Sequence, residues 1–167
     1  PVSLEVFPIG STHITNDIAL GLQIPIEEAE KIKIEYGAEN SMKKKIENIV
    51  EARLNDIFEL IENHLKKINK NGLLPAGIIL TGGGSNLPTI EEVARDSLRL
   101  PAKIGYYRQD KEGLSITGNQ KEQILKDPSW SVALGLCAYG LKEMDNGINT
   151  RRRAKNMFWR ILKSLRI

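Results

Sequence analysis

The chain has 167 residues, of which 41% are hydrophobic and 5% aromatic, so it can form one medium-sized domain with an aliphatic core. This composition favours a helix-rich α/β class over a small all-β domain. The single cysteine, Cys137, allows no internal disulfide, which favours a reducing compartment, and its apolar neighbours predict that it is buried. No run approaches the ~20 apolar residues of a spanning helix and the first residues do not resemble an export signal, so we expect a chain that is neither exported nor membrane-spanning.

The positive charge is concentrated in one segment. Of the 24 lysine and arginine residues, seven lie in residues 151–167, which contain no acidic residue. The preceding part therefore has 17 basic against 21 acidic residues, a net charge of −4. A basic surface for an anionic partner is thus expected only at this last segment.

The first 37 residues predict a strand followed by two helices. Residues 4–7 alternate like a strand, and Ser11 or Thr12 can cap a helix that carries apolar residues on one side. His13 is expected to cap or pack there rather than to bind a metal. A second helix is expected over residues 26–36, with acidic residues near its start and Gly37 just after its end.

A long amphipathic helix is expected next, because apolar residues recur at spacings of three and four over residues 42–69. Asn71 and Gly72 should terminate it. Residues 76–80 form a short apolar run that predicts a strand covered on both faces. This strand leads into a glycine-rich turn over residues 81–85 and a helix over residues 89–98.

The remaining segments continue this alternation. We expect a strand over residues 101–107 and a polar loop over 108–126 with one helical turn at most. Asp127 and Pro128 should then open a buried helix, followed by a flexible polar connector over residues 145–149. The order of elements favours an α/β sheet, although about three strands are few for an independent sheet.

Three consecutive glycines, at positions 82–84, suit a nucleotide site. Glycine lets the backbone approach a base, ribose or phosphate, and the following helix N-terminus adds positive potential. A turn that is merely rich in glycine fits the pattern equally well, and the Gly-Lys-Ser/Thr ending of a P-loop is absent.

Several segments together carry a family resemblance. Residues 8–22, residues 25–33 with Tyr36 and Gly37, and residues 72–88 resemble FtsA-type bacterial cell division proteins in order and spacing. The last segment is similar to that family's adenosine motif almost letter for letter. The resemblance implies part of the second lobe of an actin-like (ribonuclease H-like) fold over residues 1–143, a linker over 144–150 and a C-terminal amphipathic helix over 151–167.

The resemblance also implies half of a site for ATP with Mg²⁺. The residues that would line the adenosine are Gly82, Gly83, Gly84 and Asn86, and those that would face the ribose are Glu30 and Lys33. Glu30 and Lys33 could instead form a solvated helix face. The family's two phosphate loops and catalytic acid do not precede Pro1, and its usual insert after Gly37 is missing. We therefore expect the chain alone neither to bind ATP well nor to hydrolyse it, and we assign no catalytic or metal-binding residue.

Arg53 occupies the place where the family's long helix carries an arginine that engages the acidic C-terminal tail of FtsZ. An exposed arginine on a helix is a reasonable clamp for a carboxylate. Asp56, one turn later, is a further candidate. From its pattern alone, Arg53 would be a solvated surface charge.

Residues 151–167 would separate on a helix into an apolar and a basic side, as in an interfacial membrane anchor. The apolar side contains Ala154, Met157, Phe158, Ile161, Leu162 and Leu165, with Trp159 at the boundary. The basic residues are Arg151, Arg152, Arg153, Lys155, Arg160, Lys163 and Arg166. Each basic residue contributes about 1 kcal/mol near an anionic surface, and each buried large apolar side chain roughly 1.5–3 kcal/mol. The alternatives are a helix docked on the chain's own core, which the polar connector disfavours, and a nucleic-acid-binding arm, which the apolar side disfavours.

The function that these expectations imply is a scaffold and not an enzyme. It would be an actin-like protein, ATP-binding when complete, that polymerises and tethers FtsZ filaments to the cytoplasmic face of the bacterial inner membrane at the septum. No nucleic acid is expected as a partner. The alternatives are an ATPase or sugar kinase of the actin superfamily, which the glycine turn would serve equally, and a related rod-shape or pilus-assembly actin homologue.

Overall fold

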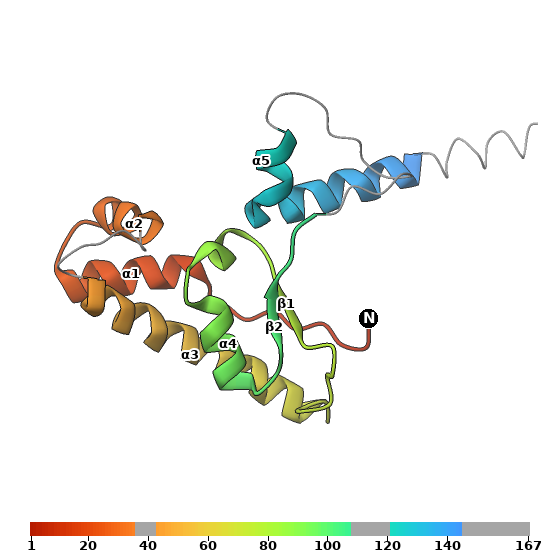
Figure 1. The fold of residues 1–167 in the computed structure, drawn as a ribbon, viewed down its shortest axis with the longest axis horizontal. Coiled ribbons are helices and arrows are strands. Elements are labelled where there is room, and N and C mark those ends of the chain that lie inside the picture. The colour runs from red at the N-terminus through yellow and green to blue at the C-terminus, as the bar shows by residue number, and fades with distance from the viewer. Residues whose placement is uncertain (36–42, 108–120, 145–167) are drawn as a thin grey trace, which may run out of the picture.

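The computed structural model describes residues 1–35, 43–107 and 121–144 (Figure 1). The helices are α1 (Ser11–Leu22), α2 (Ile26–Ile34), α3 (Lys43–Lys67), α4 (Ile90–Leu98) and α5 (Lys121–Lys126), and the strands are β1 (Ile78–Leu80) and β2 (Ala102–Ile104). Two 3-10 turns, η1 (Gly83–Asn86) and η2 (Pro128–Trp130), precede α4 and a further helix over residues 131–144. The predicted helix-rich α/β class is confirmed for the described residues.

The hydrophobic core lies where α3 packs against α1 and α4. Figure 1 shows α1 and α3 side by side, with α2 beyond α1, while α4 packs against α3 farther along that helix. On α3 the most deeply buried side chains are Val50, Leu54 and Phe58, and they meet Ile14 and Ile18 of α1. The apolar spacing that predicted α3 is therefore the spacing of its core face.

The sheet consists of two short parallel strands among the described residues. Ile78 pairs with Ala102 and Leu80 with Ile104, and η1 and α4 make the connection between the strands. Glu91 of α4 accepts a hydrogen bond from the Ile104 N–H at 2.7 Å. The prediction that β1 is covered on both faces is wrong, because Ile79 is 66% exposed. No described element packs over that side of the strand.

Residues 4–7 do not form the predicted strand. Side chains of this first segment instead contact His64 of α3: Ser3 Oγ lies 3.1 Å from Nε2 and Glu5 Oε2 3.5 Å from Nδ1. The Phe7 ring meets the imidazole edge-on. Every second residue from Ser3 to Phe7 thus faces one histidine, but no described strand offers the backbone partner that a β-strand needs.

The ends of several helices differ from the predicted ones by one or two residues. Gly10, rather than Ser11 or Thr12, is the N-cap of α1, and its N–H donates to His13 Nδ1 at 3.1 Å, so His13 does act at the cap. Asn69 takes a left-handed conformation (φ 55°) just after α3, before the predicted Asn71–Gly72 stop. Asp127 caps η2 as predicted, because it accepts from the Ser129 N–H.

The helix over residues 131–144 is exposed, so the prediction of a buried helix is wrong. Leu134 is its one buried residue, whereas Leu136 is 67% exposed and Cys137 is exposed as well. Figure 1 shows this blue helix running away from the body formed by α1 to α4. Its apolar residues lack cover because it leaves the described core after its first turn.

Some predictions lie outside the described residues. These are the end of the second helix at Tyr36 and Gly37, the first part of the polar loop, the connector and the basic amphipathic segment 151–167. The last part of the loop forms α5. Among the described helices, none has the length and apolarity needed to cross a membrane.

Candidate functional site

The glycine turn is built by its backbone geometry. Gly82 has φ +94°, which disfavours any residue with a side chain, and its carbonyl accepts from the buried Ser85 hydroxyl at 2.7 Å. A Cβ on Gly84 would lie 3.4 Å from the Cβ of Ser11. The turn therefore brings bare backbone close to the N-terminus of α1.

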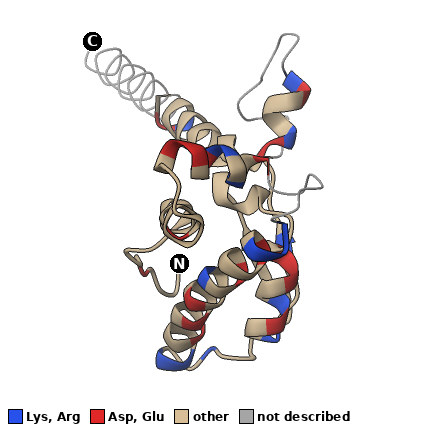
Figure 2. Cartoon of the chain, turned by 90° about the vertical axis from the view of Figure 1, so that its left-hand side faces the viewer, with Lys and Arg blue, Asp and Glu red and all other residues tan. Residues whose placement is uncertain are grey.

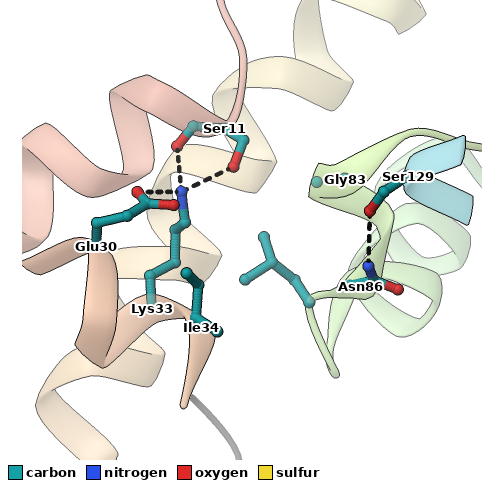
Figure 3. A pocket seen from close by; sticks show the side chains of 9 residues that line it. Ser11, Glu30, Lys33, Ile34, Gly83, Asn86 and Ser129 are labelled. Atoms are coloured by element: carbon teal, nitrogen blue, oxygen red, sulfur yellow. Dashed lines mark hydrogen bonds and ion pairs between the residues drawn. The ribbon is translucent and has the colours of Figure 1, made fainter. Parts of the chain in front are cut away.

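A cavity of about 530 Å³ opens between this turn and α2. Its lining residues are Ser11, Glu30, Lys33, Ile34, Gly83, Gly84, Asn86, Leu87 and Ser129. Figure 3 shows Ser11, Glu30 and Lys33 on one side and Gly83, Asn86 and Ser129 on the other. Of the six residues predicted for the nucleotide, five line this cavity. Gly82 does not line it, but it sets the conformation of the turn.

Glu30 and Lys33 form a tight polar cluster with α1. Lys33 Nζ donates to Glu30 Oε2 at 2.6 Å, to Thr15 Oγ1 at 2.8 Å and to Ser11 Oγ at 3.1 Å. Thr15 Oγ1 donates to the same Glu30 oxygen at 2.5 Å. Lys33 is only 10% exposed, whereas Glu30 is 45% exposed. The alternative prediction, that both residues form a solvated helix face, is therefore wrong for Lys33, and only Glu30 is partly exposed.

These contacts shift the ionisation of Glu30. The hydrogen bond from Lys33, and after it the one from Thr15, lowers the pKa of Glu30 below its ordinary value. The carboxylate therefore stays charged at neutral pH and keeps an acceptor oxygen at the cavity. A carboxylate in this position can accept hydrogen bonds from vicinal hydroxyl groups such as those of a ribose.

The opposite wall is held together by three side chains. Asn86 Nδ2 donates to Asp127 Oδ1 and to Ser129 Oγ, each at 3.2 Å, and the Gly82 N–H donates to the Pro128 carbonyl at 3.1 Å. The Ser129 N–H, and then Asn86, lowers the pKa of Asp127 by donating to its carboxylate. The start of helix 131–144 is thereby fastened to the glycine turn.

Two apolar lining residues, Ile34 and Leu87, and three polar residues that line or adjoin the cavity, Ser11, Thr15 and Ser129, were not predicted from sequence as part of a site. Ser129 follows the predicted Asp127–Pro128 cap, but nothing in that motif indicates a contact with a turn more than forty residues earlier. Thr15 is buried against Lys33. Its position one turn after Ser11 on α1 becomes informative only once α1 and α2 are known to pack together.

The described groups that line the cavity can make the contacts that a nucleoside needs. Its volume lies in the usual range for small-molecule sites, and it combines a bare glycine backbone with a carboxylate and with amide and hydroxyl groups. Among the described residues that line it, Lys33 is the one cation, and Glu30 already pairs with it. Within the described ranges no cluster of three acidic, histidine or cysteine side chains could hold a metal ion. The described lining is thus chemically compatible with a nucleoside, the half-site for ATP with Mg²⁺ stays a prediction from sequence, and no step on phosphate is assigned to these residues.

A second, charged groove of about 320 Å³ lies between α1 and α3. It is lined by Asp17, Leu20, Ile49, Ala52, Arg53 and Asp56. Arg53 is not the freely solvated charge that its pattern alone predicted: Nε and a terminal nitrogen donate to the two oxygens of Asp17 at 2.5 and 2.8 Å. The hydrogen bonds to Asp17 raise the pKa of Arg53 above its ordinary value.

Charge elsewhere on the described helices is mixed. Figure 2 shows lysine and arginine interspersed with aspartate and glutamate along them. Of the predicted membrane-binding residues, all lie in 151–167, outside the described residues. Their role stays a prediction from sequence, as do the ligands of the two cavities.

A family model and several curated relatives match this chain. A family model described as "Cell division protein FtsA" matches residues 1–135. The chain is 30% identical over 166 residues to cell division protein FtsA of Pseudomonas aeruginosa, covering 86% of this chain and 38% of that protein. It is 31% identical over 162 residues to FtsA of Borreliella burgdorferi, covering 83% and 37%.

A third relative and one solved structure match a smaller part of this chain. FtsA of Bacillus subtilis is 29% identical over 124 residues, which is 61% of this chain and 28% of that protein. The crystal structure of ethanolamine utilization protein EutJ from Carboxydothermus hydrogenoformans matches with a TM-score of 0.49 and 26% identity, over 59% of this chain and 34% of that one. The chain spans less than two-fifths of the length of the curated relatives named here.

Proposed function

This chain belongs to the FtsA family of cell division proteins, and from that premise we propose that it acts as a scaffold that tethers FtsZ filaments to the cytoplasmic face of the inner membrane at the septum. The family match over residues 1–135 is the observation that carries the proposal. The proposed role is one of binding: the protein connects a filament to a surface and is not an enzyme in its own right.

The proposed filament contact is the groove that contains Arg53. The arginine lies beside the apolar side chains of Leu20 and Ile49, so one short acidic segment could meet both a guanidinium and an aliphatic wall. We assign the acidic C-terminal tail of FtsZ to this groove. Self-association into actin-like filaments would present many such grooves along one assembly and strengthen the attachment.

The proposed membrane contact is segment 151–167. Its seven basic residues and its large apolar residues suit an amphipathic helix lying in the headgroup region of an anionic bilayer. The net charge of −4 on the preceding part makes this segment the natural site of attraction to such a surface.

The proposed nucleotide role is that of a binding site completed by further elements. The cavity beside the glycine turn offers Glu30, Lys33 and Asn86 to a nucleoside, and among its described lining residues the one cation, Lys33, is already paired with Glu30. ATP would therefore be held by this half together with phosphate-binding loops supplied by the rest of an FtsA-type protein.

A flotation experiment tests the tether directly. A fluorescent peptide with the acidic FtsZ tail is mixed with liposomes containing anionic lipid, and the fraction of peptide that floats is measured with and without this chain. We expect the peptide to float only when the intact chain is present. Loss of peptide flotation is expected for two variants: a chain ending at Asn149, which should itself stay at the bottom, and Arg53→Glu, which should still float.

The two variants separate the two halves of the proposal. Flotation of the chain ending at Asn149 to the same extent as the intact chain would refute the membrane segment. Flotation of the peptide with Arg53→Glu would refute the assigned groove. Neutral liposomes serve as the control, because attraction between segment 151–167 and the surface should fall with the surface charge.

A further inference from the structure

Arg53 is held from one side by a carboxylate of the neighbouring helix. Asp17 lies on α1 and accepts from Arg53 Nε at 2.5 Å and from Nη2 at 2.8 Å, so both of its oxygens bind one edge of the guanidinium. The two side chains are about one quarter exposed. Such a two-point contact fixes the plane of the guanidinium as well as its position.

Asp56 makes a looser contact with the other terminal nitrogen of Arg53. It accepts from Nη1 at 3.3 Å, and its side chain is 59% exposed. Within the described part of the chain, these two aspartates are the recorded partners of Arg53. A guanidinium has five N–H groups in a planar fork, and these contacts use one on Nε, one on Nη1 and one on Nη2, so each terminal nitrogen keeps one N–H that can donate to a further carboxylate.

We propose that Asp17 is a positioning residue for the Arg53 groove: it holds the guanidinium so that the remaining N–H groups of Nη1 and Nη2 are presented to a carboxylate of an acidic peptide partner. The inference rests on the proposed function, because the partner is the acidic segment assigned to this groove. It adds a residue on α1, far from Arg53 in sequence, to the recognition of that partner.

If only the net charge of the groove mattered, removing Asp17 would have the opposite effect on the binding of an acidic peptide. The groove contains two aspartates and one arginine, which gives a net charge of −1 that repels an acidic partner. If the aspartates acted only through their charge, removing either one would strengthen binding. If Asp17 acts by orienting Arg53, removing it should weaken binding although the repulsion falls.

The experiment therefore compares Asp17→Asn with Asp56→Asn in the intact chain. Each substitution removes one negative charge from the groove and nearly preserves side-chain size. Binding of a fluorescent FtsZ tail peptide is measured by anisotropy at about 0.1 M salt, where interactions over this range are not fully screened. We expect Asp17→Asn to weaken binding about fivefold to tenfold and Asp56→Asn to leave it unchanged or tighten it about twofold.

A third substitution separates orientation from a general loss of structure. Lysine has no fork that Asp17 could hold, so in an Arg53→Lys background Asp17→Asn should no longer weaken binding. Thermal unfolding of each variant shows whether the fold is kept, and Asp17→Glu, which keeps the carboxylate, should restore part of the affinity.

The outcomes are distinguishable. Tighter binding by both asparagine variants would overturn the positioning role while leaving the proposed partner intact. Equal weakening by Asp17→Asn in the wild-type background and in the Arg53→Lys background would also overturn the positioning role and leave the proposed partner intact. No peptide binding by the wild-type chain would overturn the proposed partner and this inference with it.

Discussion

Lys33 is an ammonium group that the fold has nearly removed from water. Its acceptors, Ser11, Thr15 and Glu30, all lie on α1 or one turn away on α2, so its hydrogen bonds link the two helices beside the cavity. A charge buried to this extent is stable only when it is paired, and here Glu30 is the pairing carboxylate. The stability of this corner should therefore depend on the ionisation of Glu30.

We predict that protonation of Glu30 in acid lowers the free energy of unfolding. Its pKa is lowered in the folded chain, so its contribution is fully present above the ordinary value near 4.5 and is lost as the pH falls through the lower folded value. Glu30→Gln should lower the free energy of unfolding at pH 7 by about 1 kcal/mol, a value reduced for the partial exposure of the carboxylate. The difference between variant and wild type, measured by urea denaturation, should shrink as the pH falls below the ordinary value of 4.5.

Glu122→Gln is the matched control. Glu122 pairs with Lys126 at 3.3 Å on α5, and both side chains are largely exposed, so the same change should have no measurable effect. A stability difference for Glu30→Gln that persists unchanged into acid would contradict the role given to its charge.

At this scale the sequence could predict residue types better than contacts. The glycines, Glu30 and Lys33 were identified through their motifs, and all of them except Gly82 line one cavity. Thr15, Asp17 and Ser129 were not identified, because each matters through a side chain on another helix or turn. A single sequence does not say which face of α1 meets α2 and which meets α3.

Of the described glycines, Gly77 at the entry to β1 has the least room for a side chain. Gly77 has φ +78°, and a Cβ there would lie 2.0 Å from the Pro101 carbonyl oxygen, which itself accepts from the Ile78 N–H at 2.8 Å. This contact joins the start of β1 to the residue before β2. A side chain at position 77 would push the two strands apart.

We therefore predict that Gly77→Ala destabilises the chain by on the order of 3 kcal/mol, through left-handed strain and the clash with Pro101. The measurement is the urea midpoint followed by circular dichroism. Gly135→Ala is the control: it lies within helix 131–144, a Cβ there meets nothing within 4 Å, and alanine should stabilise that helix by about 0.5–1 kcal/mol. Equal midpoints for the two variants would refute the packing argument.

The elements that sequence predicted well are those stabilised by their own periodicity. α3 has an apolar stripe along its whole length, so its extent was visible without knowledge of its neighbours. Residues 4–7 alternate like a strand but have no described strand beside them, and helix 131–144 is apolar but leaves the core. Pairing and burial depend on the presence of other elements, which local pattern does not report.

Over the whole molecule, apolar side chains remain on the surface of the described residues. Val132, Leu136 and Tyr139 follow one another at helical spacing on helix 131–144, and each is more than half exposed. Contiguous apolar patches of this kind promote association or bind hydrophobic dyes.

We predict that this chain increases the fluorescence of the dye ANS and that Leu136→Ser reduces the increase without changing the free energy of unfolding by more than about 0.5 kcal/mol. Leu134→Ser is the contrasting variant, since Leu134 is 8% exposed and its loss should cost about 2–5 kcal/mol. Dye fluorescence equal to wild type in Leu136→Ser would show that the patch lies elsewhere.

The fastening of helix 131–144 to the glycine turn has a mechanical consequence. The Gly82–Pro128 and Asn86–Asp127 hydrogen bonds act at one end of this helix, and the rest of it projects outward without further described support. At 1.5 Å per residue the helix is about 20 Å long, so a tilt of about 10° at the fastened end moves the far end by about 3–4 Å. Helix 131–144 can thus pivot about its contact with the glycine turn that borders the cavity. A small change in the position of this turn would produce a larger displacement at the far end of the helix.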